Sequence, residues 1–302
     1  MVSKLLEQTG ISLERLQSFC LVAEAGGLTK AARGNPAKQS LFSRQIKELE
    51  GFFGTELMHR MGRGIVLTPA GERLNVIARE CFASLLDFKT ESTGMPLEIV
   101  IGAGESLIRW HLLPHLVQIQ KNMPNVRLKF LNLPTSEIAR RLSDGLLDFG
   151  VIRKEAISPP LRLIPLGAVG YSLFLSSAVS SKRTSADDVS LLESLPIATL
   201  EGSGNFRQQL ATIEQKLRIT LDVRLECSSF PLVASALNSG DVAAILPSIA
   251  KIELAQFGIE QVELPALKDF DREICLAWNP RLFQIRAALE RVCEVMAKAF
   301  LI

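Results

Sequence analysis

One stretch, residues 28–74, constrains the fold of this chain more than any other part of the sequence. Thr29, Lys30 and the two alanines after them predict a short helix whose small side chains allow another helix to approach closely. A Gly-Asn-Pro turn at residues 34–36 breaks the chain before the next helix. That second helix is predicted from apolar residues that recur on one of its sides: Leu41, Phe42, Ile46 and Leu49. Two helices joined by such a turn are typical of a helix-turn-helix.

The polar side chains of the second helix lie largely off its apolar side and are predicted to face outward. Amide, hydroxyl and guanidinium groups in such a position can read base edges and hold phosphates in the major groove of double-stranded DNA. A predicted hairpin wing over residues 57–67 carries arginines near its tip, which can reach the DNA backbone or the minor groove. The predicted DNA contacts are Thr29, Lys30, Lys38, Gln39, Ser40, Ser43, Arg44, Lys47, Arg60 and Arg63.

Charge supports this interpretation through its distribution and not through its total. The net charge of +2 over 302 residues is too small to indicate a nucleic-acid partner by itself. Residues 28–66 carry seven basic side chains against three acidic ones, a local excess of four that fits a polyanionic partner. The alternative, a basic face that is merely solvated, stays open on charge alone.

The same residues carry a resemblance to the LysR-type transcriptional regulators, which runs without gaps from about residue 13 to residue 74. The matching positions are Leu28 to Ala32, Gln39, Ser43 to Ile46, Arg60, Arg63, Leu67, Thr68, Ala70 and Gly71. Asn35 stands where the family usually has an apolar core residue, which predicts altered local packing. Lys38 and Ser40 stand where the family favours serine and proline, which predicts an altered helix cap and altered base contacts.

Two longer helices flank this motif. The first opens at Ser12 or at the next residue, ends at the glycines 26 and 27, and has an apolar face of Leu13, Leu16, Phe19, Cys20 and Ala23. The second starts with Thr68 as N-cap and Pro69 in the first turn, and is predicted to run to about residue 91. Its apolar stripe consists of Leu74, Ile77, Cys81, Leu85 and Phe88.

A single projecting helix cannot bury such a stripe alone. We therefore predict that a second copy of the chain packs on it, giving a homodimer or a homotetramer. The alternative is that the stripe packs on the chain's own second domain.

From Pro96 onward, strands alternate with helices, which predicts an α/β body with mainly parallel sheets. This body resembles the two-lobed, periplasmic-binding-protein-like effector domain of the same family. The predicted fold is α/β with an N-terminal winged helix-turn-helix. Its domains are residues 1–67 for the DNA-binding head, 68–94 for the linker (dimerisation) helix and 95–302 for the effector-binding domain. Lobe I comprises 95–167 and 263–302, and lobe II comprises 168–262.

A small-molecule effector is predicted between the lobes, at corners where strands end and helices begin. Hydroxyl side chains mark three such corners, and Arg153 beyond a strand end can neutralise an anion. These features favour an organic anion, whereas Glu105 next to Ser106 opposes one and leaves a neutral or cationic ligand open. Each hydroxyl has the alternative role of a simple N-cap. The predicted effector contacts are Ser106, Thr135, Ser136, Arg153, Ser203 and Phe230.

Signals for an enzyme or a metal site are weak. The Gly-Ala-Gly at residues 102–104 lacks the third glycine of a dinucleotide loop, and Ser106 lacks the glycines of a nucleophile elbow. His111 and His115 are spaced for one helix face, but a structural or solvated pair is favoured over zinc because no acidic ligand accompanies them. Cys227 has no nearby resolving cysteine for redox sensing. We predict no catalytic residue, no metal and no cofactor.

The five cysteines are scattered without a Cys-x-x-Cys pair, which fits a reducing cytoplasm. The N-terminal residues show no secretory signal, and no apolar run approaches the roughly 18 residues of a membrane span. We therefore interpret the chain as a cytoplasmic, DNA-binding regulator of LysR type that senses an effector between two lobes. The alternative is a solute-binding or catalytic α/β protein with a helical appendage. The sequence does not determine the effector, the operator, or whether the protein activates or represses.

Overall fold

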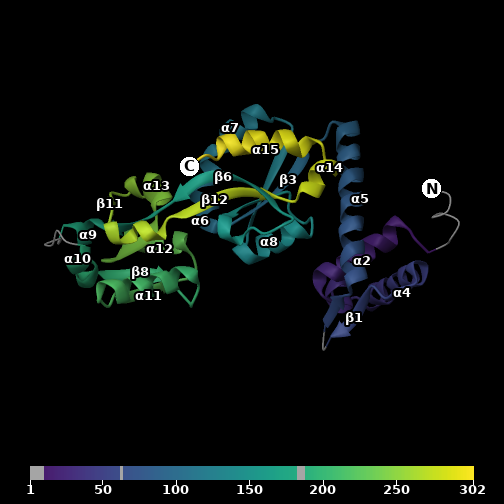
Figure 1. Cartoon of the computed structure of the whole chain (residues 1–302), viewed down its shortest axis with the longest axis horizontal. Coiled ribbons are helices and arrows are strands. Elements are labelled where there is room, and N and C mark those ends of the chain that lie inside the picture. Colours follow the sequence, from purple (N-terminus) through teal and green to yellow (C-terminus); the bar gives the residue numbers. More distant parts are fainter. Residues whose placement is uncertain (1–9, 62–63, 182–187) are drawn as a thin grey trace. The chain divides into compact units, whose positions relative to one another are not determined.

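The computed structural model describes residues 10–61, 64–181 and 188–302. Its contacts divide the chain into two compact units (Figure 1). The first unit runs to Met95 and includes the short pieces Asp144–Leu146 and Gln284–Arg286. The second unit holds the remaining residues of the body.

The first unit is a winged helix-turn-helix followed by a long helix. Ser12 caps the first helix with its side chain, and Gly26 ends it in the left-handed conformation. Thr68 caps the last helix by accepting a hydrogen bond from the Gly71 N–H at 3.0 Å. The predicted Thr68 cap is confirmed, and the first helix begins at Leu13 with Ser12 as its cap, within the predicted alternatives. The elements are α2 (Leu13–Ala25), α3 (Leu28–Ala31), α4 (Pro36–Phe53), the antiparallel strands β1 (Met58–Met61) and β2 (Gly64–Leu67), and α5 (Pro69–Thr93).

The core of this unit corrects two predicted apolar faces. Phe42, Ile46 and Leu49 of α4 are buried, but Leu41 is exposed. Spacings of four and three residues keep the first three side chains on one side of the helix, whereas Leu41 is rotated by about 100° from its neighbour. Leu13, at the first position of α2, is exposed as well.

Two local predictions at the ends of α4 have definite outcomes. Asn35 is exposed and caps α4, because its Oδ1 accepts a hydrogen bond from the Lys38 N–H at 3.2 Å. An apolar residue at this position cannot form such a cap. At the other end, the glycines at 51 and 54 predict a turn over residues 51–54. This prediction is wrong at its start, since the helix continues through Gly51 to Phe53 and ends at Gly54 (φ 65°).

Gly71 fixes how α5 leaves the wing. A Cβ atom added to this residue would lie 1.9 Å from the carbonyl oxygen of Leu57, which is a backbone atom. The first turn of α5 therefore packs directly on the backbone that leads into β1. Only glycine permits this approach.

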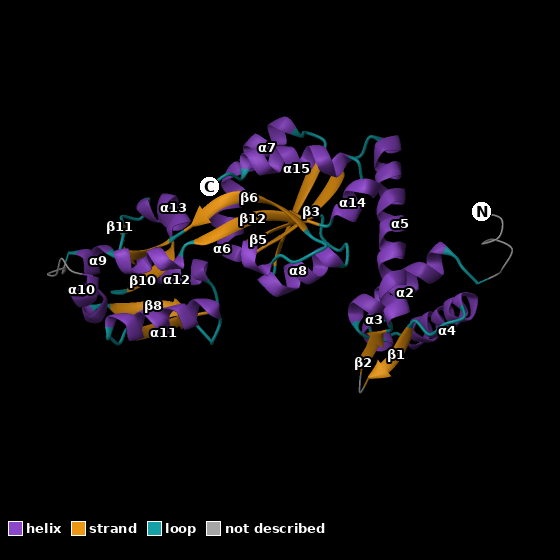
Figure 2. Ribbon diagram, viewed as in Figure 1, coloured by secondary structure: helices purple, strands orange, loops and turns teal. Residues whose placement is uncertain are grey.

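The body contains two five-stranded mixed sheets, one in each lobe (Figure 2). The lobe I sheet has the order β4-β3-β5-β12-β6, and the lobe II sheet has the order β11-β7-β10-β8-β9. The lobe I strands are β3 (Leu97–Ala103), β4 (Val126–Asn132), β5 (Phe149–Arg153), β6 (Arg162–Val169) and β12 (Arg272–Trp278). The lobe II strands are β7 (Tyr171–Leu175), β8 (Pro196–Leu200), β9 (Asp222–Cys227), β10 (Ala243–Pro247) and β11 (Glu260–Val262).

The prediction of mainly parallel sheets is only half right. In lobe I, β12 is antiparallel to β5 and β6, and in lobe II, β7 is antiparallel to β10 and β11. Both strands begin where the chain has just crossed from the other lobe. Such a strand does not need the helical crossover that joins parallel neighbours. The sequence pattern did not indicate β6, β11 or β12 as strands.

Helices cover the sheets of both lobes (Figure 2). The sequence pattern predicts one continuous helix from about residue 106 to residue 121. The structure interrupts it with a π-helical turn, Ile108–Leu112, and a 3₁₀ turn, Leu113–His115. Pro114 explains part of this irregularity because it has no N–H to donate. The helices are α6 (Glu105–Leu107), α7 (Leu116–Asn122), α8 (Thr135–Ser143), α9 (Ser177–Ser180), α10 (Asp188–Ser194), α11 (Asn205–Leu217), α12 (Phe230–Ser239), α13 (Lys251–Ala255), α14 (Pro280–Ile285) and α15 (Ala288–Ala299).

The chain changes sheets later than the sequence predicted. It leaves the lobe I sheet after Val169 and enters the lobe II sheet at Tyr171. It returns to lobe I at Asp271. The preceding 3₁₀ segment, Pro265–Phe270, still belongs to lobe II, because Leu267 and Phe270 are buried in the lobe II core. The predicted lobe boundaries were 167 and 263.

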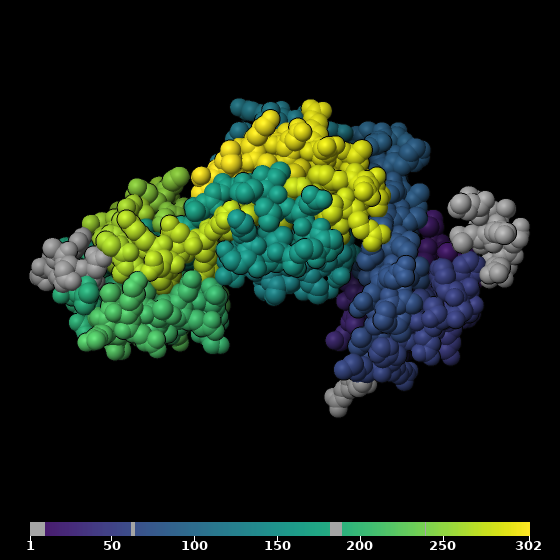
Figure 3. Space-filling view, in the orientation of Figure 1, coloured from purple at the N-terminus to yellow at the C-terminus, as the bar shows by residue number. Residues whose placement is uncertain are grey.

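Side chains of α5 reach the surface along much of that helix (blue in Figure 3). Of its predicted stripe, Leu74 is buried, whereas Ile77, Leu85 and Phe88 are 53%, 46% and 69% exposed. In the part of the chain that the structure describes, no helix is both long and apolar enough to span a membrane.

Candidate DNA-reading surface and effector cleft

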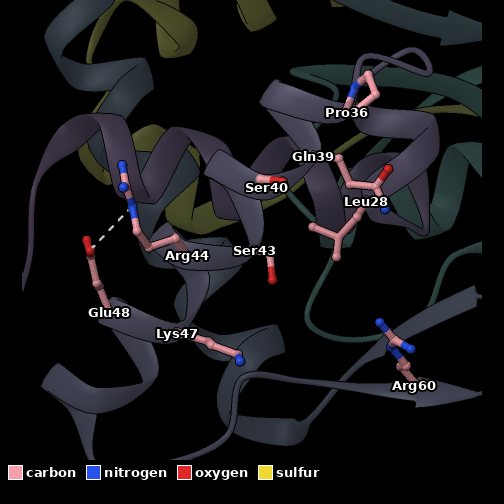
Figure 4. A pocket seen from close by; sticks show the side chains of 9 residues that line it. All are labelled: Leu28, Pro36, Gln39, Ser40, Ser43, Arg44, Lys47, Glu48 and Arg60. Carbon is pink, nitrogen blue, oxygen red and sulfur yellow. Dashed lines mark ion pairs between the residues drawn. The ribbon is translucent and has the colours of Figure 1, made fainter.

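The first unit presents an open groove between α4 and the wing (Figure 4). Gln39, Ser43 and Lys47 project from α4 into this region, and Arg60 of β1 faces it from the wing. Polar side chains from two elements therefore meet on one surface. The residues that line the groove are Leu28, Pro36, Gln39, Ser40, Ser43, Arg44, Lys47, Glu48 and Arg60.

Six of the ten predicted DNA contacts line this groove. Thr29, Lys30 and Lys38 are exposed on the same unit but lie outside the lining. Arg63 lies outside the described residues.

Two of the three acidic side chains near this surface, Glu48 and Glu50, have partners within the head. The Arg15 Nε donates to Glu48 Oε2 at 2.5 Å, and Arg44 Nε lies 3.8 Å from Glu48 Oε1. Glu50 Oε1 accepts the N–H of Leu57 at 2.9 Å, so it ties the start of the wing to α4. With these carboxylates occupied, the basic side chains dominate the groove. The link between Arg15 and Glu48 spans 33 residues, and no local pattern in the sequence indicated it.

The second unit contains a cleft of about 140 Å³ between its two lobes. Four of the six predicted effector contacts line it: Ser106, Thr135, Arg153 and Phe230. Ser136 and Ser203 are exposed and lie outside the lining. Two polar residues of the cleft, Tyr171 and Arg272, are not among the contacts predicted from the sequence. Each stands beside a point where the chain changes lobes, and these points were predicted several residues too early.

Two guanidinium groups define the electrostatics of the cleft. Arg153 Nη1 donates to Asn205 Oδ1 at 3.2 Å, and Arg272 Nη2 donates to the same oxygen at 2.8 Å. Arg272 also donates to the side-chain oxygen of Gln209. None of the described residues that line the cleft is acidic. The predicted competitor for Arg153, Glu105, is not part of the lining.

An aromatic cluster forms the lobe II wall of the cleft. The Tyr171 ring stacks on Phe206 with a centroid distance of 5.2 Å, and Phe230 lies 5.9 Å away. The Arg272 guanidinium carbon lies 5.4 Å from the Tyr171 ring centroid, a cation–π contact. Burial raises the pKa of Tyr171, although the charges of Arg272 and Arg153 oppose this shift. The tyrosine hydroxyl is therefore protonated at neutral pH and can donate a hydrogen bond.

Other contacts join the lobes away from these arginines. Arg109 of lobe I binds both carboxylate oxygens of Glu253 of α13, with Nε–Oε2 at 2.9 Å and Nη2–Oε1 at 2.9 Å. Trp110, also on the π-helical turn, is buried in a lobe II cluster that contains Phe174 and Val233. These contacts make the π-helical turn a fixed connection between the lobes.

The two histidines considered as zinc ligands have structural partners. Buried His111 places Nε2 2.8 Å from the carbonyl oxygen of Phe300, and His115 places Nδ1 2.7 Å from the carbonyl oxygen of His111. Burial raises the pKa of Cys227, which is the opposite of what a reactive thiolate needs. No group of three potential metal ligands occurs among the described residues.

Two family models match the chain. The model described as bacterial regulatory helix-turn-helix protein, lysR family, matches residues 13–72, and the LysR substrate binding domain matches residues 94–300. The chain belongs to the LysR family of transcriptional regulators. It is therefore a DNA-binding transcriptional regulator with an effector-binding domain. The predicted fold class and function are confirmed.

Relatives of this LysR-type regulator are similar over most of their length. It is 27% identical over 253 residues to a probable nitrogen assimilation transcriptional activator of Synechococcus elongatus, covering 80% of each chain. It is 23% identical over 300 residues to a probable RuBisCO transcriptional regulator of Chlorokybus atmophyticus, covering 95% of each chain.

Solved structures share the fold of this regulator. A full-length OxyR from Pseudomonas aeruginosa matches with a TM-score of 0.67 and 19% identity, covering 97% of this chain and 95% of that one. LysG from Corynebacterium glutamicum with bound effector Arg matches with a TM-score of 0.61 and 16% identity, covering 96% and 98%.

Proposed function

We propose that this regulator reads its operator with α4 and the wing and senses a small organic carboxylate in the cleft between its lobes. The assigned DNA contacts are those that line the groove of the head, together with Thr29, Lys30, Lys38 and Arg63 at its margins. The assigned effector contacts are Ser106, Thr135, Arg153, Phe230, Tyr171 and Arg272.

The observation that carries the effector assignment is the pair of arginines in a cleft whose described lining contains no acidic residue. Guanidinium groups bind carboxylates through planar, charge-assisted hydrogen bonds. Within residues 10–61, 64–181 and 188–302, neither the Ser106 nor the Thr135 hydroxyl has a protein partner, so both are available to a ligand. Apolar walls from Val169, Ile249 and neighbouring side chains suit a compact hydrocarbon body.

The volume of the cleft limits the size of this ligand. Its 140 Å³ is well below the roughly 300–1,000 Å³ of sites that hold drug-sized molecules. A short aliphatic carboxylate or a single-ring carboxylate therefore suits the cleft better than a nucleotide or a peptide.

The regulatory step follows from differential binding. An effector held by residues of both lobes stabilises one arrangement of the lobes over another, and this shift in population alters how paired DNA heads are presented. The exposed stripe of α5 is the proposed surface for pairing with a second copy. We keep residues 1–67, 68–94 and 95–302 as the proposed functional segments, place the protein in the cytoplasm and assign it no enzymatic activity.

Thermal unfolding in the presence of matched ligands tests the effector assignment. Acetate, isobutyrate and benzoate are compared with the corresponding neutral amides at equal ionic strength. A carboxylate present at a hundred times its dissociation constant is expected to stabilise the protein by about 2.7 kcal/mol. Arg153→Ala and Arg272→Ala should remove this stabilisation.

Arg162→Ala is the control, because Arg162 is exposed at the start of β6 and lies outside the cleft lining. Stabilisation by the amides alone, or stabilisation by carboxylates that survives both cleft substitutions, contradicts the proposed ligand class.

A further inference from the structure

Two neutral side chains of lobe II accept hydrogen bonds from two arginines of lobe I. Arg153 ends β5 and Arg272 begins β12, and these strands are neighbours in the lobe I sheet. Asn205 and Gln209 lie four residues apart on α11, so they project from the same side of that helix. Asn205 Oδ1 accepts from both guanidinium groups, at 3.2 Å and 2.8 Å, and Gln209 accepts from Arg272.

This arrangement leaves the guanidinium groups incompletely satisfied. An amide oxygen carries only a partial charge, yet here it is shared by two full positive charges. The Arg272 Nε is buried and has no hydrogen-bond partner in the described part of the chain. Burial lowers the pKa of Arg272 and the charge of Arg153 lowers it further, against the opposing effects of Tyr171 and Glu155. The position between the two arginines therefore suits an anionic oxygen better than the amide that is there.

We propose that Asn205 and Gln209 are internal competitors of the effector, whose carboxylate takes the position of Asn205 Oδ1 between Arg153 and Arg272. This inference rests on the proposed carboxylate effector. One position cannot hold both oxygens, so the ligand binds only when the lobe II amides release the arginines. The ligand class follows from this geometry: a single carboxylate that bridges two guanidinium groups, attached to a compact apolar body that packs on Tyr171 and Phe230.

The proposal identifies which interlobe contact changes when the effector binds. The contact between Arg109 and Glu253 and the burial of Trp110 do not involve the two arginines of the cleft. These contacts remain in place while the contact of α11 with β5 and β12 is exchanged for ligand. Lobe II is then free to change its position about the π-helical turn, Ile108–Leu112.

A structural role for the amides predicts the opposite result. If Asn205 and Gln209 only held the arginines in position for the ligand, their removal would weaken carboxylate binding. A competitor predicts tighter binding after its removal. The direction of the change in affinity therefore separates the two roles.

The experiment measures binding of isobutyrate and benzoate to the full chain by calorimetry and by thermal unfolding. Asn205→Ala with Gln209→Ala should lower the dissociation constant about tenfold or more, because hydrogen bonds to two charged donors no longer have to be broken. Asn205→Asp places a tethered carboxylate between the arginines. It should raise the unfolding temperature by about 2–4 °C without ligand and abolish the response to both carboxylates.

Gln208→Ala and Gln208→Asp are matched controls, because Gln208 is exposed in the same turn of α11 and contacts Ser203 of its own segment. They should behave like the wild type, which also separates the Asn205→Asp effect from the general preference for acids near a helix N-terminus. Asn205 and Gln208 are exposed and Gln209 is half-buried, so none of these substitutions removes a core side chain.

Each outcome has one meaning. If wild-type binding depends on Arg153 but the double alanine variant binds carboxylates equally well or more weakly, the competitor proposal is wrong and the carboxylate effector stands. If neither the wild type nor the double variant binds either carboxylate, both proposals fail. If the double variant alone binds them, the competitor proposal is supported.

Discussion

The DNA-reading groove and the effector cleft are built in different ways. All the residues that line the groove lie between positions 28 and 60, and most of them belong to the single helix α4. The residues that line the cleft lie between positions 104 and 274 and come from both lobes. A surface built on one helix inherits its geometry from the helical repeat. A site built between lobes inherits its geometry from the order of strands in two sheets.

The two sites also treat charge differently. In the groove, Arg44 is 72% exposed and its carboxylate partner lies at 3.8 Å, so its side chain can turn towards a phosphate or a base. In the cleft, Arg272 is partly buried and held by side-chain amides of the other lobe. The charges of the groove are therefore exposed, whereas those of the cleft are held in contacts with the other lobe.

The largest expected effect is on the stability of the head. It tests whether that stability depends on the close approach of Gly71 to the backbone of Leu57. Gly71→Ala places a methyl group 1.9 Å from the Leu57 carbonyl oxygen, and backbone cannot move aside as a side chain can. We expect a loss of at least about 3 kcal/mol in the free energy of unfolding of the head, and loss of DNA binding with it. Denaturant unfolding followed by circular dichroism measures the first, and fluorescence anisotropy with operator DNA measures the second.

Gly51→Ala is the matched control. Gly51 lies within α4, and an added Cβ meets no atom within 4 Å. This substitution should stabilise the helix by about 0.5–1 kcal/mol, because alanine is the better helix former. Equal effects of the two substitutions would show that the close approach at Gly71 does not control the head.

The next effect concerns the proposed pairing of two copies through α5. Ile77→Asp together with Leu85→Asp places charges in the exposed stripe of α5 and removes two apolar side chains from each copy. Since burial of one such side chain contributes about 1.5–3 kcal/mol, dimerisation should weaken on the order of a hundredfold or more. Analytical ultracentrifugation at micromolar concentration measures the change.

Leu86→Asp is the control for this pair. Leu86 is 58% exposed on α5, and the helical repeat turns it to the side opposite the stripe. A dimer that survives the double substitution, or one that is lost equally with Leu86→Asp, would move the interface away from the stripe.

A smaller effect tests whether the groove contacts DNA through independent exposed groups. Arg44→Ala should reduce operator affinity by about 1–3 kcal/mol and leave the stability of the head unchanged. If Arg44 binds a phosphate, the slope of affinity against salt concentration should also become shallower by about one. Binding titrations at several salt concentrations measure both quantities.

Arg127→Ala matches this substitution closely. Arg127 is 76% exposed on the lobe I sheet and, like Arg44, lies 3.8 Å from a carboxylate, that of Glu98. It should leave DNA affinity unchanged. An Arg44→Ala protein that binds the operator as tightly as the Arg127→Ala protein would contradict the assignment of α4 as the recognition helix.

The smallest effect is the pH dependence contributed by His111. Burial lowers the pKa of His111 below its ordinary value of 6.5, and the charge of His115 lowers it further, against the hydrogen bond to Phe300. Below pH 6.5 the unfolded chain therefore binds a proton that the folded chain does not. The free energy of unfolding should fall as the pH drops below 6.5 and be fully retained above it.

Urea unfolding between pH 5 and pH 7 measures this contribution. His111→Gln should remove it, whereas His59→Gln, at an exposed position of β1, should keep the wild-type dependence. Identical pH profiles for the wild type and His111→Gln would show that the buried imidazole does not contribute.

Most of the head could be predicted from local sequence patterns. The caps Ser12 and Thr68, the glycine at the end of α2 and the wing were all predictable, because each depends on residues a few positions apart. The same local rules did not predict which of two neighbouring apolar residues is buried, as with Leu41 and Phe42. The composition of the cleft was predictable in part: Ser106 and Thr135 follow recognisable strand ends, and Arg153, predicted just beyond a strand, is the last residue of β5.

Only the tertiary structure decided which charges meet in the cleft. Arg272 reaches Arg153 because β12 enters the lobe I sheet beside β5, although the two arginines are far apart in the sequence. Asn205 reaches both because the other lobe presents the first turn of α11 to that edge. Such contacts depend on strand order and on the two points where the chain changes lobes. A local pattern records neither, because hydrophobic periodicity specifies which face of an element is buried and not which element lies against it.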